Sequence, residues 1–372
     1  MHSSFRNAES DRLQRTRTRD AKFEDEQACQ RGPQVRRRMG GIKQTRHNSW
    51  RSRTRRQSMA CPHTLREVHE LLDALAGALA DAAVTGSQDR VVPAQLDLLF
   101  GTLAALRANR PAVWWHAVCR SIQKHPLLRR LCDDPITRHA LTKPRGYPGD
   151  AALLDLLYGL ATPLSPTPSG QAIMRYIYNT PTARGVRQRL AVLKTLARQM
   201  ATQRAGPTTL WSVAAGHLRE AEALLPAGCR FVAVDQDATS VDSIARRFAN
   251  RDVTAHVARV RDIIAGAAPP GCEIHLAYAM GLLDYLDDAT ASQLLAQMVA
   301  TLGARGTILV ANIAADSPDL GYMEAVMDWR LRARSATQLR ALLPPQIRAR
   351  MSHLRVFRDP SRTFHCLHGR LR

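Results

Sequence analysis

The hydrophobic pattern changes its period about half-way along the chain. From Thr64 onward, leucines and valines recur every three or four residues, which is the spacing of one face of a helix. After Gly206, short apolar runs alternate with helical segments, and this alternation is typical of parallel strands joined by helices. The pattern therefore predicts a helical domain over 61–205 followed by an α/β domain over 206–372.

The helical part predicts several helices and one well-defined turn. Helical periodicity covers 65–79, 93–108, 113–131, 151–160 and 186–200, with a further helical region from about Gln171. The segment Lys143-Pro-Arg-Gly-Tyr-Pro-Gly-Asp150 holds two prolines and two glycines, so it is neither a helix interior nor a central strand. We expect it to form a turn that presents Arg145, Tyr147 and Asp150.

The α/β part predicts seven strands. The apolar runs lie at 210–214, 231–234, 253–260, 274–278, 307–313, 353–357 and 363–367. Helical patterns at 218–225, 240–248 and 289–302 lie among the first five runs, which are therefore expected to be parallel. Only a turn at Asp359-Pro360 separates the last two runs, so they should form an antiparallel hairpin at the sheet edge.

The positive charge is concentrated at the N-terminus. The formal net charge is +21, and residues 1–60 hold 16 lysines and arginines against 6 acids. This segment has almost no apolar periodicity, so we expect it to be disordered. Two interpretations stay open. The segment is either a basic arm for nucleic acid or anionic lipid, or a segment without function, which includes the case of upstream sequence that is not translated, with Met59 as the start codon. Elsewhere the excess charge is diluted, so nucleic acid is not the favoured partner.

Several common classes of protein lack support in the sequence. No window reaches 18 uninterrupted apolar residues and no apolar stretch follows the first basic residues, so we expect neither a transmembrane helix nor a secretory signal peptide. The seven cysteines are scattered without a CxxC pair, which favours free thiols in a reducing cytoplasm and no metal. Motifs of the GxxxxGK[ST], HExxH and GxSxG kinds are absent. The oligomeric state stays open.

Small and acidic residues follow the first two expected strands, where ligands bind in a parallel sheet. Ala215 and Gly216 follow the first strand, and their small size lets the backbone approach a ligand, while Glu220 comes shortly after. The second strand ends at Asp235 and Gln236. A carboxylate at this position suits the two hydroxyls of a ribose.

The next two strands also end near acids. Asp262 follows the third, where a carboxylate could accept from an adenine amino group, and the fourth leads through Met280 to Asp284. Each acid alone could instead cap a helix or lie in solvent. Their recurrence at successive strand ends, without a complete GxGxxG motif, favours an adenosyl ligand over a dinucleotide.

Three motifs resemble those of a known family. They are Lys143-Pro-Arg-Gly-Tyr-Pro-Gly-Asp150 with Leu154-Asp-Leu-Leu-Tyr158, Ala215-Gly-His-Leu-Arg-Glu-Ala-Glu222, and Asn312 with Gly321-Tyr-Met-Glu-Ala-Val-Met-Asp-Trp329. The chain resembles, over about residues 65–372, a bacterial family of class I S-adenosylmethionine (SAM) methyltransferases that includes the synthase of 3-hydroxypalmitate methyl ester, a quorum-sensing signal. The resemblance implies a Rossmann-like sheet, an N-terminal helical cap domain and SAM as the cofactor.

The resemblance also implies roles for individual residues. Asp235 would hold the ribose and Asp262 the adenine, while Glu220 or Asp284 would replace the usual acid of the first strand, where this chain has Ser212. The other expected cofactor contacts are Ala215, Gly216, Gln236 and Met280, and the expected capping residues are Arg145, Tyr147, Tyr178 and Asn179. An arginine such as Arg145 or Arg187 would hold an acceptor carboxylate.

Three functions stay open at this point. The first is O-methylation of a small or fatty carboxylic acid, an acceptor that needs no general base because it is anionic at neutral pH. The second is a SAM cyclase, in which the amine of SAM attacks its own γ carbon, expels methylthioadenosine and leaves azetidine-2-carboxylate. The third is an RNA-modifying or nucleic-acid-binding protein, whose main support is the basic N-terminal segment.

Overall fold

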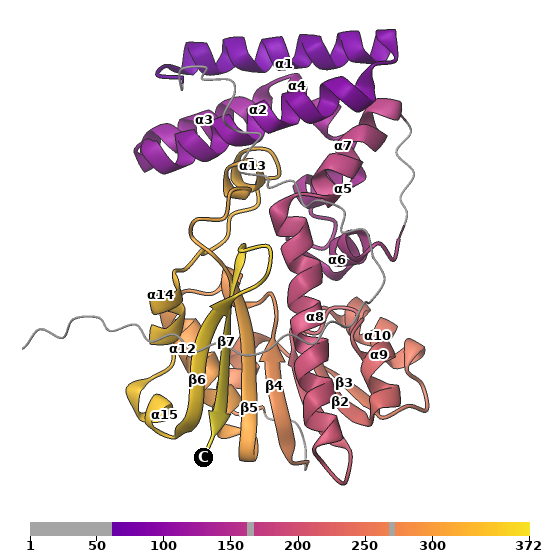
Figure 1. The fold of residues 1–372 in the computed structure, drawn as a ribbon, viewed down its shortest axis with the longest axis vertical. Coiled ribbons are helices and arrows are strands. Elements are labelled where there is room, and N and C mark those ends of the chain that lie inside the picture. The colour runs from indigo at the N-terminus through magenta and orange to yellow at the C-terminus, as the bar shows by residue number, and fades with distance from the viewer. Residues whose placement is uncertain (1–61, 162–166, 268–271) are drawn as a thin grey trace, which may run out of the picture. The chain divides into compact units, whose positions relative to one another are not determined.

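The computed structural model describes residues 62–161, 167–267 and 272–372, all within one compact unit. The disorder expected for residues 1–60 lies outside this range. Within the described residues, helices precede a seven-stranded sheet (Figure 1). The helices before the sheet are α1 (Leu65–Thr85), α2 (Gln88–Asn109), α3 (Ala112–Lys124), α4 (Leu127–Leu131), α5 (Pro135–Thr142), α6 (Ala151–Tyr158), α7 (Pro168–Tyr178) and α8 (Pro181–Thr202).

Local sequence signals set several helix boundaries. Helix α1 begins with a capping box between Thr64 and Glu67 and ends at Gly86, which adopts the left-handed conformation that glycine tolerates. The single helix expected over 113–131 is divided into α3 and α4. The chain leaves the helical conformation at His125, because Pro126 follows it and disfavours that conformation in the preceding residue.

The sheet has the order β3-β2-β1-β4-β5-β7-β6, with β1 to β5 parallel. As expected, the last two strands form an antiparallel hairpin, which leaves β6 at the edge. The strands are β1 (Thr208–Val213), β2 (Cys229–Asp235), β3 (Val253–Val257), β4 (Ile274–Ala279), β5 (Leu302–Ile313), β6 (Met351–Arg358) and β7 (Phe364–Leu371). This is the expected α/β, Rossmann-like fold with an N-terminal helical region.

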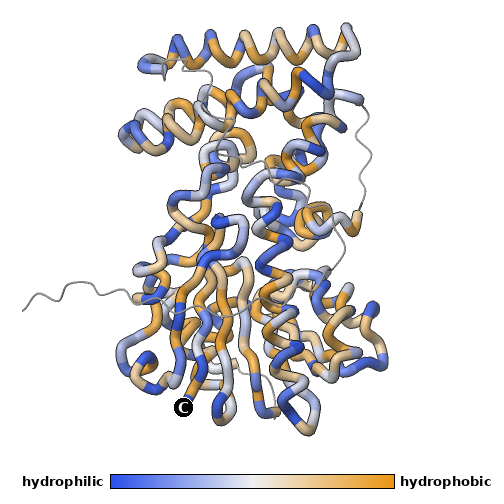
Figure 2. Tube along the Cα trace, viewed as in Figure 1, coloured by the Kyte–Doolittle hydropathy of each residue, from blue (hydrophilic) through white to orange (hydrophobic). Residues whose placement is uncertain are grey.

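The helices after β1 are shorter than those before it. They are α9 (Ala221–Leu224), α10 (Ala238–Arg247), α11 (Val260–Ile264), α12 (Asp288–Ala300), α13 (Leu320–Ala325), α14 (Ala336–Ala341) and α15 (Pro345–Ala349). Strands β1 and β4 are buried along their whole length, and apolar residues accumulate along the central strands (Figure 2). Such continuous burial is typical of parallel strands that are covered on both faces.

The apolar core of the helical region includes residues from the far end of the chain. Helix α13 packs against α2 and α3 (Figure 1), and a Cβ on Gly321 would lie 2.6 Å from the backbone of Leu103. Tyr322 stacks on Phe100 with ring centroids 4.2 Å apart. The segment 320–329 after β5 is therefore part of the helical core, which is not confined to residues before 205.

Helix α2 is, among the described helices, the one long and apolar enough to cross a membrane by length and composition. Its large apolar side chains, such as Leu96, Leu99 and Leu103, are buried in the core formed with α1, α7 and α13. A core helix of a folded domain gives the same signal, so the composition of α2 is weak evidence for a membrane span.

Candidate functional site

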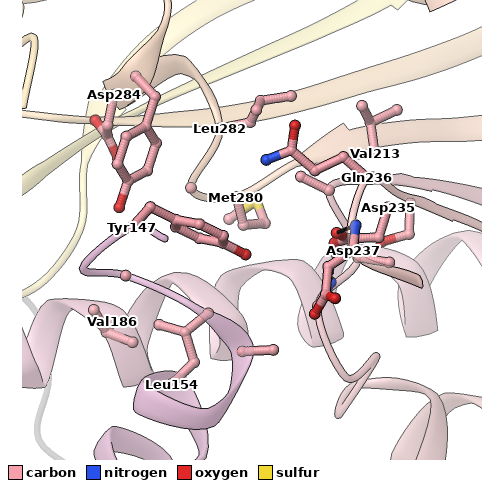
Figure 3. Close-up of a pocket in the computed structure, with 18 of the residues that line it drawn as sticks. Tyr147, Leu154, Val186, Val213, Asp235, Gln236, Asp237, Met280, Leu282 and Asp284 are labelled. Carbon is pink, nitrogen blue, oxygen red and sulfur yellow. Dashed lines mark hydrogen bonds between the residues drawn. The ribbon is translucent and has the colours of Figure 1, made fainter. Parts of the chain in front are cut away.

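A cavity of about 750 Å³ lies at the carboxyl ends of β1, β2 and β4. This size is within the range of small-molecule sites. Its walls also include the turn at 145–149 and residues of α6 and α8. Figure 3 shows Asp235, Gln236 and Asp237 at one end and Asp284 at the other, with Tyr147 and Met280 between them.

The loop after β1 forms one wall with its backbone. Ala214, Gly216 and Leu218 all have positive φ, between 49° and 57°, a conformation that is strained for alanine and leucine. The loop is held by Asp235, whose carboxylate accepts from the backbone N–H groups of Gly216 at 2.8 Å and Asp237 at 2.9 Å. Asp235 thus ties the loop after β1 to the end of β2.

Three carboxyl groups line the cavity without a basic partner. Asp235, Glu220 and Asp284 are each under a tenth exposed, and none has a described base within 4.0 Å. Glu220 accepts from the Tyr278 hydroxyl at 2.5 Å and Asp284 from the Ile313 N–H at 2.6 Å. Burial nevertheless raises the pKa of all three carboxyls, that of Asp284 to about 6. The cavity therefore favours a cationic ligand, whose charge would offset the cost of burying these carboxylates.

The turn at 143–150 contributes two of the expected residues. Arg145 donates to the Asp237 carboxylate at 2.6 Å and to Ser240 at 2.9 Å, so it joins the turn to the start of α10. Tyr147 lies in the cavity edge-to-face with Tyr285, at 6.3 Å between ring centroids, and burial raises its pKa to about 12. Its hydroxyl therefore stays protonated at neutral pH.

The first and second motifs are joined by one buried carboxylate. Asp155 on α6 accepts from His217 at 2.8 Å and from Arg219, both in the segment after β1. Burial raises the pKa of Asp155, but these hydrogen bonds outweigh it and hold the pKa below its ordinary value. This cluster fixes the helical region against the loop that forms the cavity wall.

The first and third motifs meet at two aromatic rings. The indole N–H of Trp329 donates to the Tyr285 hydroxyl at 3.0 Å, and both rings line the cavity. Gly149 lies directly against them: a Cβ there would be 2.3 Å from the Tyr285 hydroxyl oxygen and 2.6 Å from a Trp329 ring carbon. Glycine is therefore required at 149 for this ring pair to form.

We expect Gly149→Ala to displace Tyr285 and Trp329 and to lower the free energy of unfolding by about 1–3 kcal/mol, as overpacking does. Turnover should fall as well, because both rings line the cavity. Thermal unfolding and initial rates would measure the two effects. Gly77→Ala, in an open position on α1, is the matched control and should leave both unchanged or slightly raise stability. Wild-type behaviour of Gly149→Ala would contradict this packing.

Most of the expected site residues lie at the cavity, and four do not. The cavity wall includes Arg145, Tyr147, Asp284, Ala215, Gly216, Glu220, Asp235, Gln236 and Met280. Asp262 is outside the cavity wall. Because β3 ends at Val257, Asp262 lies in α11, where its carboxylate accepts from the Arg259 N–H. Ala258, Val260 and Ile263 form this part of the wall instead.

Tyr178 and Asn179 lie at the end of α7, outside the cavity wall. Asn179 donates to the Arg175 carbonyl, and the Tyr178 ring is covered by Arg187 at 4.0 Å. Arg187 also donates to the carbonyls of Leu157 and Tyr178, so its guanidinium is engaged in holding backbone. The structure therefore does not bring Tyr178, Asn179 or Arg187 to the site.

The most informative residue that the sequence analysis missed is Arg189. It lines the cavity from α8, is 6% exposed, and lies on the same buried stripe of the helix as Val186, Leu193 and Ala197. A charged residue in an apolar stripe of helical spacing was the signal that could have identified it. Phe364 was missed as well, and the guanidinium carbon of Arg189 lies 4.7 Å from the centre of its ring.

No family model and no curated protein matches the chain. Among solved structures, it is similar to a possible exported protein from Bordetella parapertussis, with 18% identity over 71% of this chain and 98% of that one and a TM-score of 0.50. This similarity concerns the fold alone.

Two methyltransferases of known structure also match, more weakly. Magnesium protoporphyrin IX methyltransferase from Synechocystis, solved with SAM, is 10% identical over 52% of this chain and 82% of its own, with a TM-score of 0.38. The N-methyltransferase NodS from Bradyrhizobium japonicum, solved with S-adenosylhomocysteine, is 12% identical over 52% and 89%, with a TM-score of 0.37. Such remote similarity assigns no function to this chain.

Proposed function

We propose that this protein is a SAM-dependent methyltransferase that acts on a small or fatty carboxylic acid. The observation that supports this most is the charge pattern of the cavity. Among the described residues, it is lined by three buried carboxyls without a basic partner and by the buried guanidinium of Arg189. SAM carries a sulfonium and an ammonium, which match the carboxyls, and a carboxylate, which matches the guanidinium. An adenosyl ligand also suits the position of the cavity at the carboxyl ends of parallel strands.

The residues around the cavity suit the parts of SAM. Asp235 would accept from the ribose hydroxyls with the acceptor positions that Gly216 and Asp237 leave free. Glu220 or Asp284 would compensate the ammonium, whose charge would in turn lower their raised pKa values. Further contacts would come from Ala215, Gln236, Met280 and the apolar residues Ala258, Val260 and Ile263.

The acceptor would lie at the end of the cavity near Asp284. Apolar and aromatic side chains line the cavity, and this set suits an acid with an apolar body: Tyr285, Met323, Trp329, Leu331 and Phe364. Bound SAM supplies an electrophilic methyl group. The acceptor's carboxylate would give its electron pair to that carbon as the carbon–sulfur bond breaks, which yields a methyl ester and S-adenosylhomocysteine without a proton transfer. The protein's contribution is then to position and dehydrate the carboxylate.

Mass spectrometry of the nucleoside product tests this function. Purified protein would be incubated with SAM, with and without 3-hydroxypalmitate and shorter carboxylic acids. We expect S-adenosylhomocysteine only when an acid is present, together with the methyl ester. Methylthioadenosine formed enzymatically from SAM alone would support the cyclase instead. The proposal would be overturned if the protein bound no SAM and formed neither S-adenosylhomocysteine nor methylthioadenosine under any condition.

A further inference from the structure

Arg189 is a buried positive charge without an acidic partner. It is 6% exposed, and among the described residues no carboxylate lies within 4.0 Å of its guanidinium. Its Nε has no hydrogen-bond partner within the described part of the chain. Leaving a charge and a donor unpaired in a protein interior is costly, so a position of this kind indicates a missing anion.

The surroundings of Arg189 occupy one face of its guanidinium and leave its Nε donor unpaired among the described residues. The carbon of the guanidinium lies over the Phe364 ring, 4.7 Å from its centroid, so one face is used in stacking. Gly281, directly after β4, provides room, because a Cβ there would lie 2.9 Å from Nη2. The in-plane N–H groups that remain match the two oxygens of a carboxylate.

The described polar groups near Arg189 do not neutralise it. The Tyr158 hydroxyl is a hydrogen-bonding neighbour, and burial, the largest influence, raises its pKa to about 12, so it stays neutral at neutral pH. Asp284 lies farther away. Although Arg189 lowers the pKa of Asp284, burial prevails and leaves that pKa at about 6. The two side chains share the cavity without forming an ion pair.

We propose that Arg189 binds a carboxylate inside this cavity, in place of Arg145 and Arg187, which are engaged elsewhere. The inference rests on the proposed function for the identity of that carboxylate. It belongs either to the acceptor acid or to the methionine part of SAM. Arg189 is then a substrate-binding residue, and the fork of its guanidinium fixes the direction from which the carboxylate enters.

The first arm of the test separates the SAM carboxylate from the rest of the nucleoside. Dissociation constants of S-adenosylhomocysteine and methylthioadenosine, which lacks the amino-acid part, are measured by calorimetry for wild type and Arg189→Met. If Arg189 holds the methionine carboxylate, the variant should bind S-adenosylhomocysteine about 30-fold more weakly, the usual loss of a charge-assisted pair, with methylthioadenosine unchanged.

The second arm addresses the acceptor. Binding of 3-hydroxypalmitate and of saturated acids from acetate to palmitate is measured with the protein alone and with saturating S-adenosylhomocysteine. If Arg189 holds the acceptor, Arg189→Met should weaken binding of the acid about 30-fold and leave its methyl ester unaffected. Arg189→Lys should recover part of the affinity, since it keeps the charge without the fork.

Arg187→Met is the matched control, two residues away on α8 and outside the cavity wall. It should lower stability through its lost backbone contacts and leave every dissociation constant unchanged. A folded Arg189→Met protein in which neither arm changes would overturn the inference. Wild type that binds neither nucleoside would instead overturn the proposed function, and the acid arm would still decide the role of Arg189.

Discussion

Replacing Asp235 with alanine should weaken binding of S-adenosylhomocysteine about 100-fold or more, because a carboxylate that accepts two ribose hydroxyls contributes charge-assisted hydrogen bonds of about 1.5–3 kcal/mol each. The same change removes the acceptor for the N–H groups of Gly216 and Asp237, so the strained loop after β1 would lose its anchor. Calorimetric titration of wild type and variant measures the loss.

Two further variants make the result specific to Asp235. Asp235→Asn keeps the volume but presents an NH₂ group to one of the partners, so it should bind almost as weakly as Asp235→Ala. Asp252→Asn removes an exposed acid that pairs with Arg230 outside the cavity wall and should bind normally. Normal binding by a folded Asp235→Ala protein would contradict the ribose role and with it the orientation proposed for SAM.

The sequence predicted this end of the site because its signals are local. A run of apolar residues that stops at an acid, as at Asp235, defines both the strand and its carboxyl end within a few positions. The same reasoning was wrong for the length of the third strand. β3 ends at Val257 because a short helix begins at Val260, in whose first turn the Asp262 carboxylate accepts from the Arg259 N–H. Alternating burial along β3 gives a weaker boundary signal than the continuous burial of β1.

The remaining features depend on contacts between distant segments. Gly321 approaches Leu103 across more than two hundred residues, so no local pattern indicated that the segment after β5 belongs to the helical core. Arg189 is one of several arginines on α8. Its place in an apolar stripe sets it apart from Arg187, but its packing against Phe364 and Gly281 could not be read from the sequence. Motif residues could be recognised from the sequence, but which of them touch one another could not.

The pairing of motifs can be tested at Asp155. Asp155→Ala should leave His217 and Arg219, both mostly buried, without their shared carboxylate. Removing one partner from a buried ionic cluster costs about 3 kcal/mol or more. For a folded unit of this size, the melting temperature should fall by about 5 °C. Glu70→Ala, which removes an exposed ion pair with Arg66, is the control and should have little effect.

The stabilisation by Asp155 should depend on pH in a defined direction. Because the pKa of Asp155 is lowered in the folded protein, its contribution is fully present above the unfolded pKa of about 3.9 and is lost as the pH falls through the folded value. The difference in melting temperature between wild type and Asp155→Ala should therefore be constant near neutral pH and shrink only below about pH 4. A difference that shrinks well above that pH would assign the effect to another group. An unchanged melting temperature at pH 7 would mean that the helical region and the loop after β1 are held together by other contacts.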